Sequence, residues 1–169
     1  VTWLGGVSRR SEPADGFFDA NALSDPDAAT ALFQSDAPIT VVPIDLSYQA
    51  VLTDAQLDAI RTGATPQARF AWQILPFYCD FYEAFIGRWS ACMHDPIAAA
   101  IAIDPSFGTR EVERSIVMEP FEDRVHAHGQ SEPVSGFPPK RIVVEAEVSR
   151  FLDYFVERLL GSVDPVYRG

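Results

Sequence analysis

Two short polar stretches carry side chains that could act on a small polar substrate. Asp19 and Asn21 lie two residues apart in a loop, and His94 and Asp95 stand directly before a proline. An imidazole that titrates near neutrality can transfer a proton. A carboxylate can bind a hard metal ion. Because ligands of open α/β sheets bind at loops that lead from strands into helices, these residues are candidates for one site.

Tyr78 and Tyr82 form a third candidate. They are four residues apart in a predicted helix and therefore share one helical face. Two aromatic rings with hydroxyl tips could line a pocket and stack on a flat base. The alternative is core packing, because both tyrosines belong to an aromatic cluster with Phe77, Phe81 and Phe85.

The other candidates also have structural explanations. Asp95 before Pro96 is a good helix N-cap, as Asp25 is before Pro26. Asn21 could hydrogen-bond within its own loop, and His94 could be an ordinary residue at a helix entry. The residues alone therefore name no reaction.

The elements that would position these side chains alternate between strand and helix. This order predicts an α/β fold, an open doubly wound and mostly parallel sheet flanked by helices. Strands are expected at residues 1–4, 39–44, 111–118 and 141–147, and helices at 25–35, 53–61, 66–89 with a break or kink at Pro76, 97–103 and 149–160. The intervening segments 8–24 and 121–139 are expected to be polar loops, the second one partly extended.

Because Val1 already lies in a predicted core strand, we interpret residues 1–169 as the carboxyl-terminal part of a single domain, incomplete at its amino terminus. The formal net charge of -11 argues against nucleic acid, which needs a cationic face. No apolar run approaches the roughly 20 residues of a membrane helix. Two cysteines are too few for a disulfide framework, which favours the cytoplasm. Alanine richness and the use of Arg over Lys suggest a bacterial genome.

Four stretches occur in the order and spacing of a known family. They are Leu4-Gly5-Gly6, Asp19-Ala20-Asn21 running into Asp25-Pro26-Asp27-Ala28-Ala29, Val42-Pro43-Ile44-Asp45-Leu46-Ser47, and His94-Asp95-Pro96. With the final strand and helix from Arg141 to Leu160, they resemble the second half of the inosine/uridine-preferring nucleoside hydrolases. The resemblance spans essentially the whole chain.

This resemblance implies hydrolysis of the N-glycosidic bond of ribonucleosides to base and ribose, with a water activated by Ca²⁺. It implies that Asp95 is a metal ligand, that the remaining ligands lie upstream of this chain, and that the fragment alone is inactive. His94 would protonate the leaving base, and Asn21 with Asp19 would bind the ribose. Tyr78 and Tyr82 would lie over the base. The family also implies a homo-oligomer.

The chain departs from the family pattern in ways that support a second hypothesis. Asp19-Ala20-Asn21 stands where the family usually has Glu-Phe-Asn, and Pro13 lies near the position of an expected asparagine. A Thr-Arg-Gly stretch near the end is absent around Val125 to Gly129. The alternative is therefore a non-catalytic homologue that acts as a ligand-binding or scaffold protein. An unrelated α/β hydrolase half is a more remote third hypothesis.

Two other pairs of residues could support a different chemistry. His126 and His128 would share one face of a strand, as zinc ligands sometimes do, but no third ligand stands at a telling spacing. Cys92 and His94 could form a thiol–imidazole pair, although no oxyanion device accompanies them.

Overall fold

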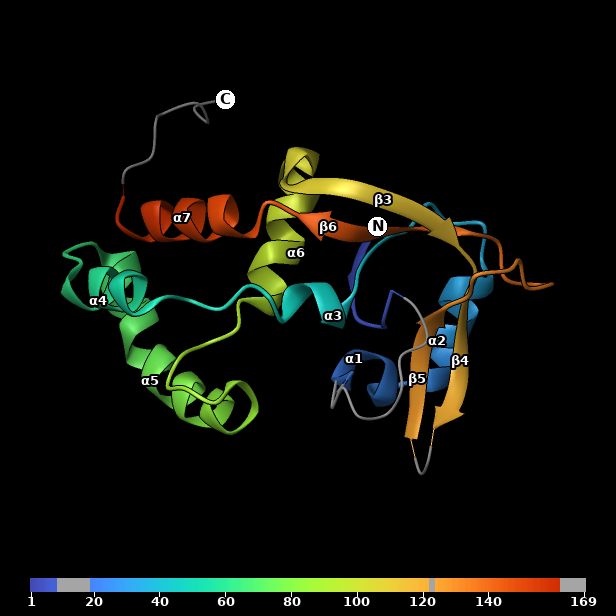
Figure 1. Cartoon of the computed structure of the whole chain (residues 1–169), viewed down its shortest axis with the longest axis horizontal. Coiled ribbons are helices and arrows are strands. Elements are labelled where there is room, and N and C mark those ends of the chain that lie inside the picture. The colour runs from blue at the N-terminus through green and yellow to red at the C-terminus, as the bar shows by residue number, and fades with distance from the viewer. Residues whose placement is uncertain (9–18, 122–123, 162–169) are drawn as a thin grey trace. The chain divides into compact units, whose positions relative to one another are not determined.

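The structure, a computed structural model, describes residues 1–8, 19–121 and 124–161, with the backbone alone for 119–121 and 124–126 (Figure 1). Pro13 therefore lies outside the described residues. The chain forms two compact units. The first consists of Val1–Gln49 and His94–Glu147, and the second of Ala50–Met93 and Val148–Gly169.

The first unit contains a four-stranded sheet in the order β1-β2-β6-β3. Strands β1 (Thr2–Leu4), β2 (Thr40–Val42) and β6 (Lys140–Ala146) run parallel to one another. Strand β3 (Gly108–Arg114) pairs with β6 in the antiparallel sense and closes one edge (Figure 1). All three residues of β2 are buried, as its apolar sequence predicts for a strand covered on both faces. The predicted α/β class with a mostly parallel sheet is confirmed.

The strand predicted at residues 39–44 is shorter than expected. Pro43 ends it, because proline has no N–H to donate to a neighbouring strand. Pro43 is the N-cap of a one-turn helix, α3 (Ile44–Ser47). The apolar character of Ile44 and Leu46 reflects their burial in this helix and not a longer strand.

The single strand predicted at residues 111–118 is in fact two. β3 ends at Arg114, and a new strand, β4 (Ile116–Phe121), pairs with β5 (Arg124–Gly129) in a separate hairpin. The buried Ser115 lies between β3 and β4, and its hydroxyl donates to the carbonyl of Phe137 at 2.6 Å. Because this contact lies 22 residues away in sequence, the local pattern could not reveal it.

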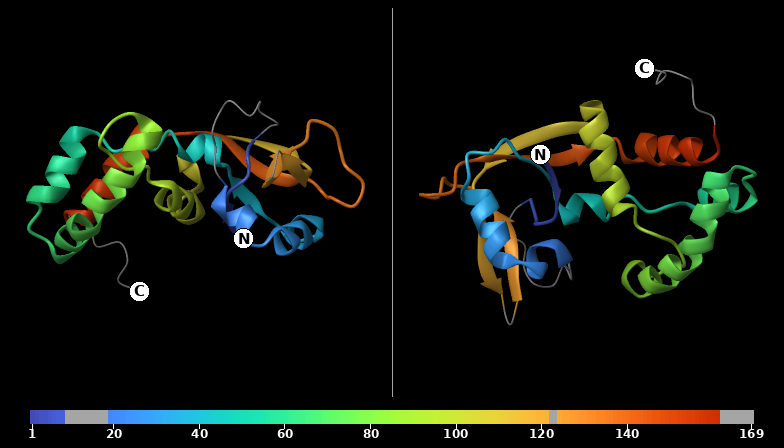
Figure 2. Two further views of the ribbon diagram at one scale, coloured as in Figure 1. Left: turned by 90° about the horizontal axis from the view of Figure 1, so that it is seen from below. Right: turned by 180° about the vertical axis from the view of Figure 1, so that it is seen from behind.

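Helices of the first unit pack against both sheets. α1 (Ala20–Ser24) contacts β5, and α2 (Pro26–Gln34) contacts β4; all four elements lie side by side (Figures 1 and 2). α1 lies in a segment predicted to be a loop. The helix has only five residues, too few for a periodic apolar pattern, and it begins at the N-cap Asp19. α6 (His94–Ile103) contacts β1 and α3. The core of this unit includes Phe33, on which the Trp3 ring stands edge-on at 5.0 Å.

The second unit packs three helices together, α4 (Asp54–Thr62), α5 (Pro66–Ile86) and α7 (Val148–Leu159) (Figure 2). Their starts follow the sequence signals closely. α4 begins with a capping box of Thr53 and Gln56, and α5 begins after the N-cap Thr65. α5 runs through Pro76 without interruption and ends at Ile86, three residues before the expected end.

Gly87 explains that early end, since it adopts the left-handed conformation with φ of 71° and donates to the carbonyl of Glu83. Within the described residues, no helix has the length and apolar character that a membrane crossing requires.

Candidate functional site

The predicted site residues of the first unit lie around the carboxyl ends of β1 and β2. β1 runs into Gly5 and Gly6, both with positive φ, of 145° and 67°. A Cβ atom on Gly6 would lie 3.0 Å from the carbonyl oxygen of Ala127, so a side chain there would be crowded as well as strained. Backbone bonds extend past the strands, because Gly5 donates to Val42 and Ile44 donates to Gly6.

Asp19 fastens α1 to this glycine turn. Its Oδ1 accepts from the backbone of Ala22 at 3.1 Å, and its Oδ2 accepts from the backbone of Gly6 at 2.6 Å. The residue is 2% exposed. Both carboxylate oxygens therefore accept from backbone N–H groups, and the side chain is buried.

Asn21, in contrast, lies at the surface of α1. Its amide nitrogen donates to the carbonyl of Leu4, the last residue of β1, at 2.8 Å. The bond fixes the side chain at the carboxyl end of that strand. The predicted alternative, a bond within its own loop, is wrong, because the partner is 17 residues away. The amide oxygen of Asn21 accepts no hydrogen bond from the described residues and is available to a hydroxyl group.

His94 is the first residue of α6 and is buried. Its Nδ1 lies 2.8 Å from the hydroxyl of Ser47, at the end of α3. The ring of Tyr48 stands edge-on to the imidazole, with centroids 4.7 Å apart. Burial lowers the pKa of His94, and the neighbouring Asp95 carboxylate opposes that change. His94 is therefore a positioned side chain rather than a freely rotating one.

Asp95 is the second residue of α6 and is exposed. The helix begins one residue before it, so Asp95 lies within the first turn instead of preceding it as an N-cap. Its carboxylate forms no hydrogen bond with the part of the chain that the structure describes. Capping therefore does not explain this acid, in contrast to Asp25, whose carboxylate accepts from Ala28 at 2.9 Å.

One hydrogen-bonded route joins these positions. Gly6 accepts from Ile44 with its carbonyl and donates to Asp19 with its N–H. The helix that begins at Ile44 carries Ser47, which reaches His94. The structure thus brings Asp19, Asn21, His94 and Asp95 to the ends of two adjacent strands, as the topology of an open α/β sheet predicts.

Two residues of this site carried no predicted role. Asp45 holds Ser8, whose N–H and hydroxyl reach the two carboxylate oxygens at 3.0 and 2.6 Å. Ser47 contacts His94 from 47 positions away. Both residues belong to the stretch from Val42 to Ser47, one of the stretches that resemble the family. That resemblance could have drawn attention to them, but the spacing of residues in the sequence did not indicate their partners.

Tyr78 and Tyr82 belong to the second unit and are close to each other. Their rings are 4.7 Å apart and their hydroxyl oxygens 3.4 Å apart on α5. Tyr82 is buried and Tyr78 half-buried. Core packing does not account for the phenylalanines beside them, because Phe77 is 80% exposed and Phe81 and Phe85 are each 55% exposed.

The alternative chemistries gain no support. Burial raises the pKa of the Cys92 thiol to about 11, with Arg88 opposing the shift, so that Cys92 is protonated at neutral pH and a poor nucleophile. His128 is buried in β5, and the side chain of His126 lies outside the described part. Among the described residues, no three His, Cys, Asp or Glu side chains are grouped as a metal site.

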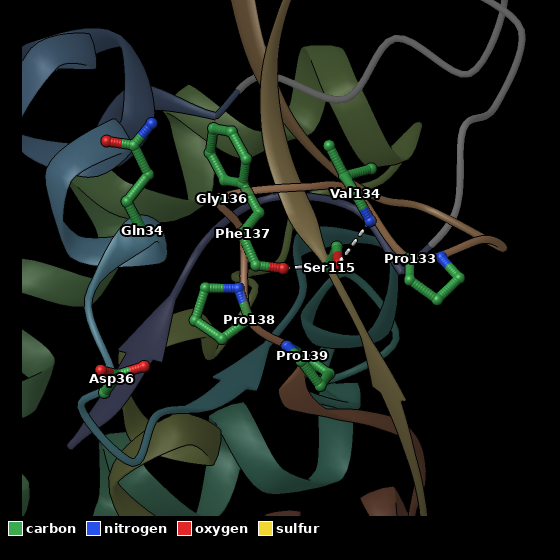
Figure 3. Close-up of a pocket in the computed structure, with 9 residues that line it drawn as sticks. All are labelled: Gln34, Asp36, Ser115, Pro133, Val134, Gly136, Phe137, Pro138 and Pro139. Carbon is green, nitrogen blue, oxygen red and sulfur yellow. Dashed lines mark hydrogen bonds between the residues drawn. The ribbon is translucent and has the colours of Figure 1, made fainter.

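A hollow of about 400 Å³ lies at the opposite ends of the parallel strands from the candidate site (Figure 3). Pro138 and Pro139, which line it, directly precede β6, and Asp36 precedes β2. It therefore lies at the amino ends of these parallel strands. Ser115 on its wall is engaged by Val134 and Phe137. The hollow is distinct from the candidate site, which lies at the carboxyl ends.

The mostly parallel sheet flanked by helices, with polar side chains at the carboxyl ends of β1 and β2, makes the chain an α/β protein of the open-sheet class. The model of the family "Inosine-uridine preferring nucleoside hydrolase" matches residues 1–153, and the chain belongs to this family. An inosine-uridine preferring nucleoside hydrolase of Crithidia fasciculata is 36% identical over 91 residues, which are 54% of this chain and 29% of that protein. A probable uridine nucleosidase 2 of Oryza sativa subsp. japonica is 25% identical over 96% of this chain and 50% of its own length.

Solved structures agree with this assignment. A purine-preferring ribonucleoside hydrolase from Gardnerella vaginalis superimposes with a TM-score of 0.70 and 30% identity, over 86% of this chain and 46% of that one. A plant nucleoside hydrolase gives a TM-score of 0.76 at 22% identity, over 91% and 50% of the two chains, and shows the same fold. Where nearly all of this chain is matched, it spans about half the length of the relative.

Proposed function

We propose that this chain supplies part of the active site of a nucleoside N-ribohydrolase, which hydrolyses the N-glycosidic bond of a ribonucleoside to base and ribose. The observation that supports the proposal is the placement of His94, Asp95 and Asn21 at the carboxyl ends of β1 and β2 or on helices packed there. All three lie within the segment that the family model matches.

In this proposal His94 protonates the departing base. Cleavage of an N-glycosidic bond leaves an electron pair on the base nitrogen, and an acid that delivers a proton there lowers the barrier. The contacts of His94 with Ser47 and Tyr48 suit this role, because a proton donor must be held in a defined direction.

Asn21 and Asp19 serve the ribose in different ways. The amide oxygen of Asn21 can accept from a ribose hydroxyl, while its nitrogen is held on Leu4. Asp19 is one methylene shorter than the glutamate usual in the family, and in this proposal it supports ribose binding by capping α1, the helix that carries Asn21. Tyr78 and Tyr82 would stack on the base.

Asp95 would contribute one oxygen ligand to a Ca²⁺ ion. The described residues do not complete such a site, because calcium takes six to eight oxygens and no cluster of three candidate ligands occurs among them. In this proposal the remaining ligands come from residues beyond those described. The exposed carboxylate of Asp95, without a hydrogen bond to the described chain, is compatible with that shared role.

One observation favours the alternative of a non-catalytic homologue that binds a ligand or acts as a scaffold. Asp19 directs both oxygens to backbone N–H groups and is almost fully buried. Ala20 beside it has no ring to pack against a sugar. A protein that lost ribose recognition would show these features.

Turnover separates the two functions. The full-length protein, supplied with Ca²⁺ and a panel of purine and pyrimidine ribonucleosides, is expected to release free base. Asp95→Ala should abolish turnover and reduce calcium binding. Asp27→Ala is the matched control, because Asp27 is also an exposed acid in a first helical turn. Intact turnover in Asp95→Ala would end the assignment, and ligand binding without turnover in the wild type would favour the homologue.

Two further properties stay predictions from the resemblance and the composition. They are homo-oligomerisation, which light scattering of the full-length protein measures, and a cytoplasmic location.

A further inference from the structure

Ser47 and His94 form a buried pair whose purpose is not evident from either residue alone. The Ser47 side chain is completely buried, at 0% exposure, and His94 is 8% exposed. Ser47 Oγ lies 2.8 Å from Nδ1 of His94 and 3.2 Å from the carbonyl oxygen of Ile44. The hydroxyl is thus positioned between a ring nitrogen and a backbone acceptor.

The pair does not resemble an activated nucleophile. A nucleophilic serine must reach its substrate, whereas the Ser47 hydroxyl has no exposed surface. A role that needs no contact with a substrate fits the geometry better.

The single proton of the Ser47 hydroxyl links its two contacts to the tautomer of the imidazole. A serine hydroxyl has one proton to donate and can accept hydrogen bonds with its lone pairs. Both contacts of Ser47 are satisfied together only if it donates to Ile44 and accepts from a proton on Nδ1. With the proton of Ser47 on the Nδ1 side, two acceptor oxygens would face each other at 3.2 Å in a buried place.

From this geometry we infer that Ser47 is a positioning residue, which keeps the Nδ1 of His94 protonated and so assigns Nε2 to proton transfer with the substrate. The functional part of the inference rests on the proposed nucleoside hydrolase activity. The contact also fixes the direction of the ring, together with the edge-on ring of Tyr48. Ser47 therefore acts through His94 and does not touch the substrate.

Nuclear magnetic resonance tests the inference without any turnover. The chain has only three histidines, so long-range ¹H–¹⁵N correlations of the ring nitrogens are readily assigned with a His94→Gln variant. At a pH where His94 is neutral, we expect the wild type to hold its proton on Nδ1. In Ser47→Ala the population ratio should shift toward Nε2 protonation by about fivefold, corresponding to one ordinary hydrogen bond. Ser47→Thr, which keeps the hydroxyl, should restore the wild-type tautomer.

Ser90→Ala is the matched control. Ser90 is equally buried, and its hydroxyl donates to the carbonyl of Leu52 at 2.6 Å. This variant loses a buried hydroxyl group with the same chemical change but should leave the His94 tautomer unaltered. A shift in both variants would mean a general loosening of the fold and would overturn the inference.

A wild-type ring protonated on Nε2, or an unchanged ratio in Ser47→Ala, would also overturn it. Should Ser47→Ala fail to fold, the wild-type tautomer and Ser47→Thr still decide. The result is separable from the proposed function, since the tautomer is read without substrate. In an active full-length protein, Ser47→Ala should lower kcat about fivefold, with KM little changed, because the doubly protonated ring, held through its Nδ1–H, gives its Nε2 proton to the base in the transition state.

Discussion

The Oδ2 atom of Asp19 lies 2.6 Å from the backbone nitrogen of Gly6, across 13 residues of sequence. This bond joins the N-cap of α1 to the turn that ends β1. The carboxylate that the resemblance assigns to the ribose also accepts hydrogen bonds from the backbone with both of its oxygens. We therefore expect Asp19 to contribute to the free energy of unfolding, which can be measured.

Asp19→Ala should lower the free energy of unfolding by about 2–4 kcal/mol. The substitution removes an N-cap, at about 1 kcal/mol, and leaves the buried N–H of Gly6 without its acceptor, at about 1–3 kcal/mol. Urea denaturation measures the change. Asp25→Ala is the control. Asp25 caps α2 from an exposed position through Ala28, so that its loss should cost about 1 kcal/mol. Equal losses in the two variants would contradict the additional role of Asp19.

His94→Gln should reduce the kcat of the full-length protein on natural nucleosides by about 10²–10⁴-fold, the usual contribution of a general acid. The loss should be small for a riboside with a p-nitrophenolate leaving group, because that group departs without a proton. An equal loss on both kinds of substrate would show that His94 does not deliver the proton.

The burial of His94 predicts that stability falls as the pH is lowered. Its pKa in the folded protein lies below the ordinary histidine value of 6.5, so the unfolded chain takes up a proton first. Stability is therefore fully present above pH 6.5 and decreases as the pH falls below it, toward the lower pKa of the folded state. The difference in urea midpoint between pH 7.5 and pH 5.5 should be larger in the wild type than in His94→Gln. Identical differences would contradict a buried neutral imidazole.

Both cysteines should resist alkylation in the native protein. Burial raises the pKa of Cys79 to about 11, with a contribution from Asp80, and that of Cys92 to about 11. At pH 7 the thiolate fraction is on the order of 10⁻⁴. Mass spectrometry after iodoacetamide treatment should find the native chain unmodified and the urea-unfolded chain labelled at both positions. Rapid native labelling of Cys92 would revive the thiol–imidazole alternative.

The amino-acid sequence alone predicted several features because their causes are local. A capping box at Thr53, a proline at the first position of α2 and an apolar run at β2 each determine structure through neighbouring residues. The same information placed His94 and Asp95 at the start of a helix. Four stretches in order indicated the family, which the family model confirms.

Only the tertiary structure assigned the partners of the site residues. The contact of Ser47 with His94 spans 47 positions, and that of Asp19 with Gly6 spans 13. The hydroxyl that divides β3 from β4 is held by a residue 22 positions away. Sequence periodicity reports which face of an element is buried, whereas a hydrogen bond between elements depends on how the sheet brings their ends together. For this reason the residues of the candidate site could be proposed from the sequence, but not which atoms they contact.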